Sequence, residues 1–116
     1  MRCIWVLFWL FVLTVPAMAE FDSGNDLYRF CNSNDGFEKG LCYGLISGHF
    51  DNLHLAYQCK HSSAPNISRQ QVVDIVMQAL RQNPQERHLP AYLLSSRAMI
   101  RAFDCESWVG SGPAKR

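Results

Sequence analysis

Apolar residues in the middle of the chain recur at the spacing of one helix face, and polar turn signals divide them into four stretches. The first predicted helix begins near Ser23, an N-cap residue followed at the third position by Asp26, and it ends in the polar run 32–36. The second predicted helix extends over residues 37–58. The apolar-face positions of these two helices are Leu27, Phe30, Cys31, Leu41, Cys42, Leu45, His49, Leu53 and Ala56.

The third predicted helix carries the clearest start signal. Ser68 and Gln71 form a capping box, and Ile67 and Val72 stand where a hydrophobic staple would lie. This helix should end near Asn83. Its apolar stripe consists of Val72, Val73, Val76, Ala79 and Leu80.

Pro90 decides where the fourth helix begins, because proline lacks a backbone N–H and clashes with the carbonyl four residues earlier in a regular helix. We therefore place the continuous helix at about 90–103, with 83–88 as a turn or a short separate coil. The positions expected to face inward are Ala91, Leu94, Ala98 and Ala102.

No strand-like alternation of useful length is present, so the sequence predicts an all-α fold. Four helices with short connections favour a small four-helix bundle with up-down-up-down topology. Gly40, Gly44 and Gly48 recur at every fourth residue of the second helix. Such a stripe predicts close approach of another helix backbone, inside the bundle or across a two-fold axis, and a kinked helix is the alternative.

The N-terminal segment is typical of a secretory signal peptide over residues 1–19. Arg2 precedes an apolar run that Pro16 interrupts, and Ala17-Met18-Ala19 has the small-x-small pattern of a cleavage site. The run is short for a membrane span, although a retained N-terminal anchor is the alternative. We expect export to the periplasm, a helical domain over residues 20–107, and a flexible C-terminal tail over residues 108–116.

Export would leave four cysteines in an oxidising compartment, which predicts two disulfides. Cys42 and Cys59 are too far apart to pair if one continuous helix joins them. Cys31 ends the first helix where the second begins, whereas Cys59 and Cys105 end the second and fourth helices at the other end of the bundle. The predicted bonds are therefore Cys31–Cys42 and Cys59–Cys105.

Charge and motifs exclude several classes of function. Removal of residues 1–19 takes away Arg2 and leaves ten basic and ten acidic residues, so the remaining chain is neutral and not suited to nucleic-acid binding. His49 and His54 do not share a helix face, and the sequence has neither an HExxH nor a G-x-S-x-G motif. We expect no enzymatic activity, no metal site, no cofactor, and a half-buried structural role for His49.

The polar connection between the third and fourth helices is the candidate partner-binding segment. It lies between Pro84 and Pro90, which should stiffen it. A stiff segment loses little conformational entropy on docking. The predicted contact residues are Gln85, Glu86, Arg87 and His88.

The order of these features resembles a known family. The pattern comprises Phe21-Asp22-Ser23-Gly24-Asn25-Asp26-Leu27 before Cys31, Cys42-x-Gly44-x-Ile46-x-Gly48 with Asp51, Cys59, Ile67-Ser68-x-x-Gln71, Asn83-Pro84-x-x-Arg87-His88-x-x-Ala91 and Ala102-Phe103-Asp104-Cys105. It resembles the Tai/Rap immunity family of small periplasmic helical proteins associated with type VI secretion. Asp104, where the family usually has proline, and Pro90 depart from its pattern.

The resemblance implies a binding protein that dimerises and blocks the substrate groove of a peptidoglycan amidase toxin. An alternative from another class is a small acid-stress periplasmic chaperone, which needs a loosely held fold that exposes apolar surface in acid. Two disulfides favour the rigid inhibitor over the chaperone.

Overall fold

The computed structural model describes residues 22–60 and 67–107, and this part of the chain is mainly helical. The predicted signal peptide and C-terminal tail lie outside the described residues and stay predictions. Among the described residues, no helix is both long and apolar enough to cross a membrane. The elements in chain order are α2 (Gly24–Asn32), α3 (Gly36–Leu53), β1 (Tyr57–Cys59), α4 (Arg69–Gln82), the 3₁₀ turn η1 (Pro84–Glu86), α5 (Ala91–Phe103) and β2 (Cys105–Ser107).

The predicted start signals of α2 and α4 are confirmed. The Ser23 hydroxyl accepts from the backbone N–H of Asp26, and the Asp26 carboxylate accepts from the backbone N–H of Ser23. Ser68 and Gln71 form the same reciprocal pair at the start of α4. Each pair satisfies two donors that a helix N-terminus would otherwise leave unbonded, so both helices begin where local sequence places them.

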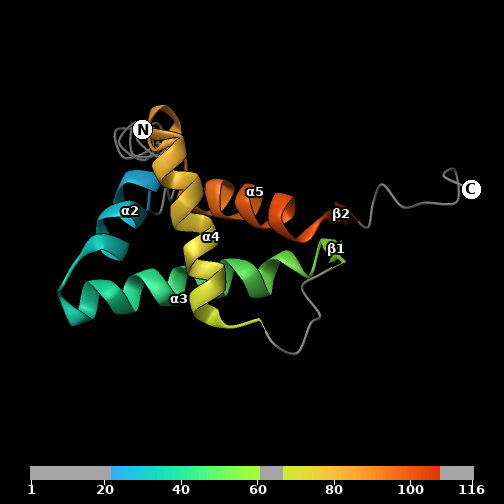
Figure 1. The fold of residues 1–116 in the computed structure, drawn as a ribbon, viewed down its shortest axis with the longest axis horizontal. Coiled ribbons are helices and arrows are strands. Elements are labelled where there is room, and N and C mark those ends of the chain that lie inside the picture. The colour runs from blue at the N-terminus through green and yellow to red at the C-terminus, as the bar shows by residue number, and fades with distance from the viewer. Residues whose placement is uncertain (1–21, 61–66, 108–116) are drawn as a thin grey trace, which may run out of the picture.

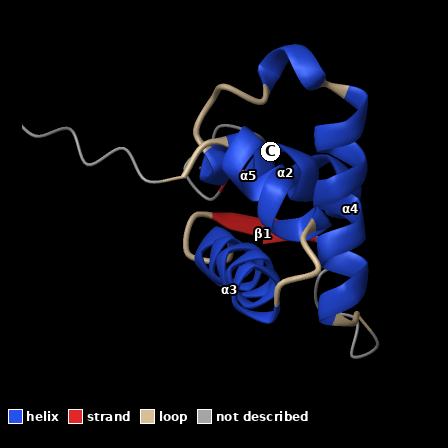
Figure 2. Ribbon diagram, turned by 90° about the vertical axis from the view of Figure 1, so that its left-hand side faces the viewer, coloured by secondary structure: helices blue, strands red, loops and turns tan. Residues whose placement is uncertain are grey.

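The helices form two layers, with α4 lying across α2, α3 and α5 (Figures 1 and 2). The colours of Figure 1 show that α3 and α5 run in the same direction, and their ends meet where β1 and β2 pair. The aligned up-down-up-down arrangement is not confirmed, because α4 crosses α3 and α5 instead of lying alongside them.

The second helix is shorter than predicted, and the expectation of no strands is wrong. α3 ends at Leu53, and the chain then turns into the three-residue strand β1. β1 pairs antiparallel with β2 so that Cys59 lies opposite Cys105. Strands this short carry no measurable alternation, and their pairing depends on residues distant in sequence, so periodicity could not reveal them.

Both disulfides connect the cysteines that the sequence pairs. Cys31 bonds to Cys42 and ties the end of α2 to the first half of α3. Cys59 bonds to Cys105 and ties β1 to β2. Cys59 reaches the end of α5 although α3 is shorter than expected, because the turn after Leu53 continues toward that end.

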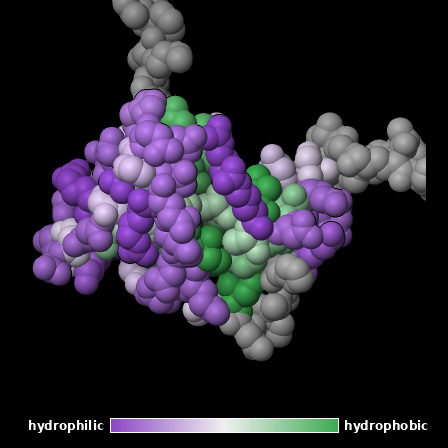
Figure 3. All heavy atoms as spheres, turned by 45° about the horizontal axis from the view of Figure 1, so that its top comes forward, coloured by the Kyte–Doolittle hydropathy of each residue, from purple (hydrophilic) through white to green (hydrophobic). Residues whose placement is uncertain are grey.

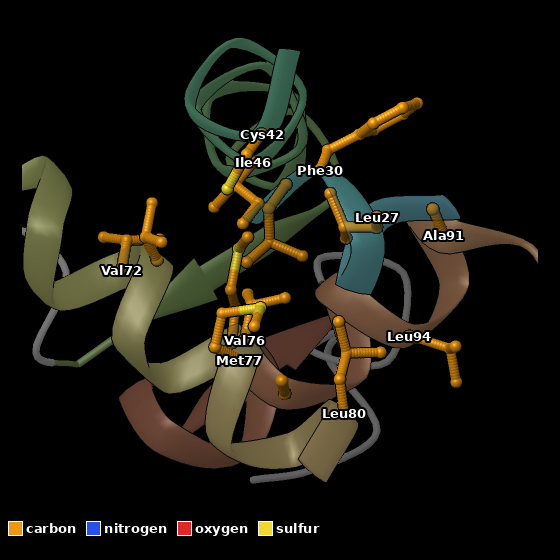
Figure 4. Packing of buried hydrophobic residues seen from close by; sticks show 14 of the residues in the cluster. Leu27, Phe30, Cys42, Ile46, Val72, Val76, Met77, Leu80, Ala91 and Leu94 are labelled. Carbon is orange, nitrogen blue, oxygen red and sulfur yellow. The ribbon is translucent and has the colours of Figure 1, made fainter. Parts of the chain in front are cut away.

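The core lies between the two layers and draws residues from all four helices (Figure 4). Ile46 of α3 and Val76 and Met77 of α4 point toward one another at its centre. Ile46 is fully buried although the predicted face of its helix omitted it. Ala91, Leu94 and Ala98 are buried on the inner face of α5 as predicted, and Met99 and Phe103 complete that face. Ala102 and Ala56, which were also predicted to face inward, are exposed.

No other described helix packs against the glycine stripe of α3, which consists of Gly40, Gly44 and Gly48. A Cβ atom added to Gly40, Gly44 or Gly48 meets no described atom within 4 Å, and all three residues are exposed. Of the two packings predicted for the stripe, the one inside the bundle is therefore wrong, and packing across a two-fold axis stays a prediction. α3 is also a single 18-residue helix through these glycines, so the alternative of a broken helix there is wrong too.

Candidate functional site

The candidate site is the polar connection from Asn83 to Pro90, which the structure folds into a short 3₁₀ turn. Pro84 occupies its first position, where a missing N–H costs no bond. The N–H groups of Glu86 and Leu89 donate to the carbonyls of Asn83 and Glu86 at 3.1 and 2.9 Å. The turn that Pro90 predicts before α5 is thus confirmed, and α5 begins directly after Pro90.

The start of α2 holds this turn from the side. The N–H groups of Gly24 and Asn25 donate to the carbonyls of Leu89 and Arg87 at 2.8 and 2.7 Å. The N–H of Ala91 donates in turn to the Asp22 carbonyl at 2.9 Å. These bonds satisfy backbone N–H groups that the first turn of a helix leaves without a partner, so the 3₁₀ turn and the start of α2 stabilise each other.

Arg87, one of the four predicted contact residues, is occupied within the fold. Its Nε donates to the Leu80 carbonyl at 2.7 Å, and its guanidinium lies 3.9 Å from the centroid of the Tyr28 ring. A charged hydrogen bond and a cation–π contact each stabilise the position of this side chain. The side chain of Arg87 therefore connects the turn to α4 and α2.

The backbone of the turn and the Leu94 side chain lie so close to Gly24 that this position has no room for a Cβ atom. A Cβ atom at this position would overlap the Leu94 side chain and lie 2.8 Å from the Arg87 carbonyl oxygen. Because the second atom belongs to the backbone, rotation of a side chain could not remove the overlap. The contact between α2 and the turn therefore depends on the missing side chain of Gly24.

The remaining predicted contact residues differ in exposure. Gln85 and His88 are exposed, and Glu86 is partly buried. Tyr92, in the first turn of α5, was missed by sequence reasoning, and 61% of its surface is exposed. Its position directly after a polar turn could have indicated a contact residue, because aromatic residues are enriched at protein interfaces. The turn and the start of α5 thus offer Gln85, His88 and Tyr92 to a partner.

Three titratable groups of the described chain, Asp26, His49 and Lys60, have shifted pKa values with clear causes. The hydrogen bond from the Lys60 ammonium to the Asp104 carboxylate raises the pKa of Lys60. Hydrogen bonds from the Ser23 side chain and backbone hold the pKa of Asp26 below its usual value. Burial lowers the pKa of His49, and the nearby negative charge of Asp22 opposes that shift. The Nδ1 atom of His49 is buried and has no hydrogen-bond partner among the described residues.

The histidines do not assemble a site in the described part of the chain. His49 is half-buried on α3, in keeping with the structural role expected from its spacing, and His54 and His88 are exposed. His61 lies outside the described residues. Within residues 22–60 and 67–107, no three side chains of the metal-ligating types gather around a common point.

Comparison with known proteins identifies the family to which the chain belongs. No curated protein and no solved structure matches the chain. A family model described as "Rap1a immunity proteins" matches residues 23–105, which include both disulfides, the turn and the helix start that holds it. The match confirms the resemblance found in the sequence, and the chain belongs to the Rap1a immunity protein family.

Proposed function

We propose that this chain is an exported immunity protein of type VI secretion that binds a peptidoglycan amidase toxin in the periplasm. The observation that carries the proposal is the family match over residues 23–105. An immunity protein acts by binding its cognate toxin, and that role needs a shaped surface but no catalytic groups. The predicted signal peptide over residues 1–19 supports the periplasmic location.

The turn between α4 and α5 is the proposed contact with the toxin, and it would block the toxin's substrate groove. Backbone bonds to α2 and the side chain of Arg87 already fix its shape before any partner arrives. Preorganisation of this kind raises affinity because little conformational entropy is lost on docking. Gln85, His88 and Tyr92 would touch the toxin, with Glu86 at the edge of the contact.

We assign Arg87 a positioning role in this contact. Its guanidinium faces Tyr28 and the Leu80 carbonyl, so its side chain serves the partner only by holding the turn. Of the four residues predicted to contact the partner, we thus assign Arg87 to holding the turn and keep Gln85, Glu86 and His88 as contact residues.

The predicted homodimer belongs to the same proposal, and light scattering on the purified, oxidised protein tests it.

The test measures inhibition of amidases encoded near this chain's gene, with peptidoglycan hydrolysis as the readout. We expect stoichiometric inhibition by the wild-type protein and a Kd raised about tenfold or more in the double variant Gln85→Ala/His88→Ala. The matched control is Lys39→Ala/Gln58→Ala, which changes two exposed residues on α3 and β1. An equal loss of affinity in the control would contradict the turn as the toxin contact. If the protein inhibits none of these amidases, the proposal that its target is an amidase is wrong.

A second pair of variants tests the positioning role. Arg87→Ala should weaken toxin binding and also speed amide hydrogen exchange at Gly24 and Asn25, since their acceptor carbonyls lose a fixed position. Arg87→Lys keeps the charge but lacks the Nε donor, so it should show both effects to a smaller extent. Weakened binding with unchanged exchange would instead mean that Arg87 touches the toxin directly.

A further inference from the structure

A groove of about 350 Å³ lies between α4 and α5, and the core residues Leu80, Leu94 and Ala98 are among those that line it. Its apolar residues come from both helices, and polar side chains border it. Figure 3 turns this top side of the molecule forward and shows hydrophobic surface flanked by hydrophilic side chains. The lining residues that the argument uses are Ile75, Ala79, Glu86, Ala98, Arg97 and Arg101.

Two arginines of α5 border this groove. Arg97 and Arg101 are four positions apart, which places them one above the other on the same helix face. Both are exposed, and neither has an acidic partner within 4 Å among the described residues. Arg29 shows the contrast, because its guanidinium pairs with Glu38 at 3.3 Å.

One acidic residue, Glu86, also lines the groove, and it reaches the groove from the turn after α4. Glu86 forms no ion pair with either arginine. The groove therefore combines an apolar floor, two cations one helical turn apart, and a single carboxylate. This pattern is complementary to a segment with an apolar side chain between or beside carboxylates.

The remainder of this chain is a poor occupant of the groove. Residues 1–21, 61–66 and 108–116 together contain a single acidic residue, Glu20. The C-terminal segment ends in Lys115 and Arg116, which Arg97 and Arg101 would repel. Charge complementarity thus points to a separate protein as the source of the carboxylates.

We infer that the groove between α4 and α5 binds an acidic segment of the toxin, which places an apolar side chain over Ile75, Ala79 and Ala98 and carboxylates on Arg97 and Arg101. The inference rests on the proposed function for the identity of the partner. Carboxylate–guanidinium bonds would fix the register of the segment, and the apolar contact would add buried area. Because Glu86 lies at both sites, the groove and the turn form neighbouring parts of one binding face.

A random peptide display library, panned on the oxidised protein and counter-selected on the double variant Arg97→Glu/Arg101→Glu, tests the chemistry of the groove. We expect the selected peptides to be rich in Asp and Glu next to an apolar residue. A synthetic peptide of the selected sequence should bind the double variant at least tenfold more weakly. The control Arg69→Glu/Arg81→Glu makes the same charge change at exposed residues of α4 outside the groove and should bind the peptide as the wild type does.

Three results would overturn the inference. Selected peptides that lack acidic residues would contradict the role of the arginines. Equal weakening by Arg69→Glu/Arg81→Glu would show a general charge effect. A chain ending at Ser107 that binds the peptide more tightly than the full chain would show that residues 108–116 occupy the groove.

The toxin itself separates this inference from the function on which it rests. Arg97→Glu/Arg101→Glu should weaken the toxin complex about tenfold and make its affinity less sensitive to salt. A toxin that binds this variant as tightly as the wild type would overturn the groove as a toxin site while the immunity role stands. If no amidase binds the wild-type protein, the proposed function fails, and the inference about the toxin segment fails with it. Peptide binding would then report only the chemistry of the groove.

Discussion

The starts of α2 and α3 carry the same local signal but satisfy their backbone donors in different ways. Each helix begins with a capping residue followed by glycine, Ser23-Gly24 in one and Asp35-Gly36 in the other. The Asp35 carboxylate alone accepts two backbone N–H bonds at 3.0 Å each. The start of α2 has its own capping box, and its first N–H groups also donate to carbonyls of residues 87 and 89, more than sixty positions along the chain.

A capping signal thus fixes where a helix begins but not what the helix start contacts. A Cβ atom at Gly36 would meet nothing within 4 Å, whereas one at Gly24 would collide with the Arg87 carbonyl. The start of α3 is therefore self-contained. The start of α2 is a docking surface for the turn that we propose binds the toxin.

Removing the disulfide between α2 and α3 should change the stability of the protein the most. Cys31→Ser/Cys42→Ser should lower the free energy of unfolding by about 3 kcal/mol, because the disulfide restricts the unfolded chain. Urea unfolding followed by circular dichroism measures the change. A control with Ser33→Ala and Ser47→Ala keeps the bond, and a loss below about 1 kcal/mol in the cysteine variant would show that hydrogen bonds already hold the helices together.

A smaller effect is expected from filling the space at Gly24. Gly24→Ala should destabilise the fold by about 2 kcal/mol, since the new methyl group overlaps backbone that cannot move without breaking the bonds to the turn. Gly36→Ala is the matched control at the same helix position and should change the stability by less than about 0.5 kcal/mol. Equal effects of the two substitutions would contradict the comparison.

The exposed glycine stripe of α3 should respond in the opposite direction. Gly44→Ala is expected to stabilise the monomer by about 0.7 kcal/mol, because alanine has the higher helix propensity and its methyl group meets no described atom. Thermal unfolding of dilute protein measures the change. Destabilisation by this substitution would reveal a close contact to the stripe from outside the described residues.

The smallest expected effect is the pH dependence that His49 contributes. Burial lowers the pKa of His49 in the folded protein, so the unfolded chain takes up a proton at higher pH than the folded one. The free energy of unfolding should therefore fall as the pH drops below about 6.5 and level off below the lowered pKa. His49→Leu should reduce this slope, which urea unfolding at a series of pH values measures.

Local signals were sufficient for the parts of the fold that depend on few neighbouring residues. Ser23 with Asp26, Ser68 with Gln71, and Pro90 each fix a helix boundary through bonds or clashes within four residues. The disulfide pairing also followed, because it needs only the end of the bundle at which each cysteine lies. The sequence thus predicted the helical segments of the described chain to within a few residues, except at the C-terminal end of α3.

Features set by distant contacts could not be predicted from spacing. The strand β1 forms by pairing with residues 105–107, which lie far along the chain, and its three residues carry no periodic signal. Arg87 turns inward because Tyr28 and the Leu80 carbonyl lie beside it, although its sequence context is polar. The candidate turn was therefore located correctly along the chain, while the division between its outward and inward side chains required the fold.

The bonds between the start of α2 and residues 87–89 also bear on the order of events as the chain is made. α2 is the first described helix to be synthesised, yet its leading N–H groups find their carbonyl acceptors only after some sixty further residues have emerged. Contacts of such long sequence separation form late and slow folding, because a large loop must close before they stabilise anything. The docking of the start of α2 onto this turn should accordingly be among the last contacts to form.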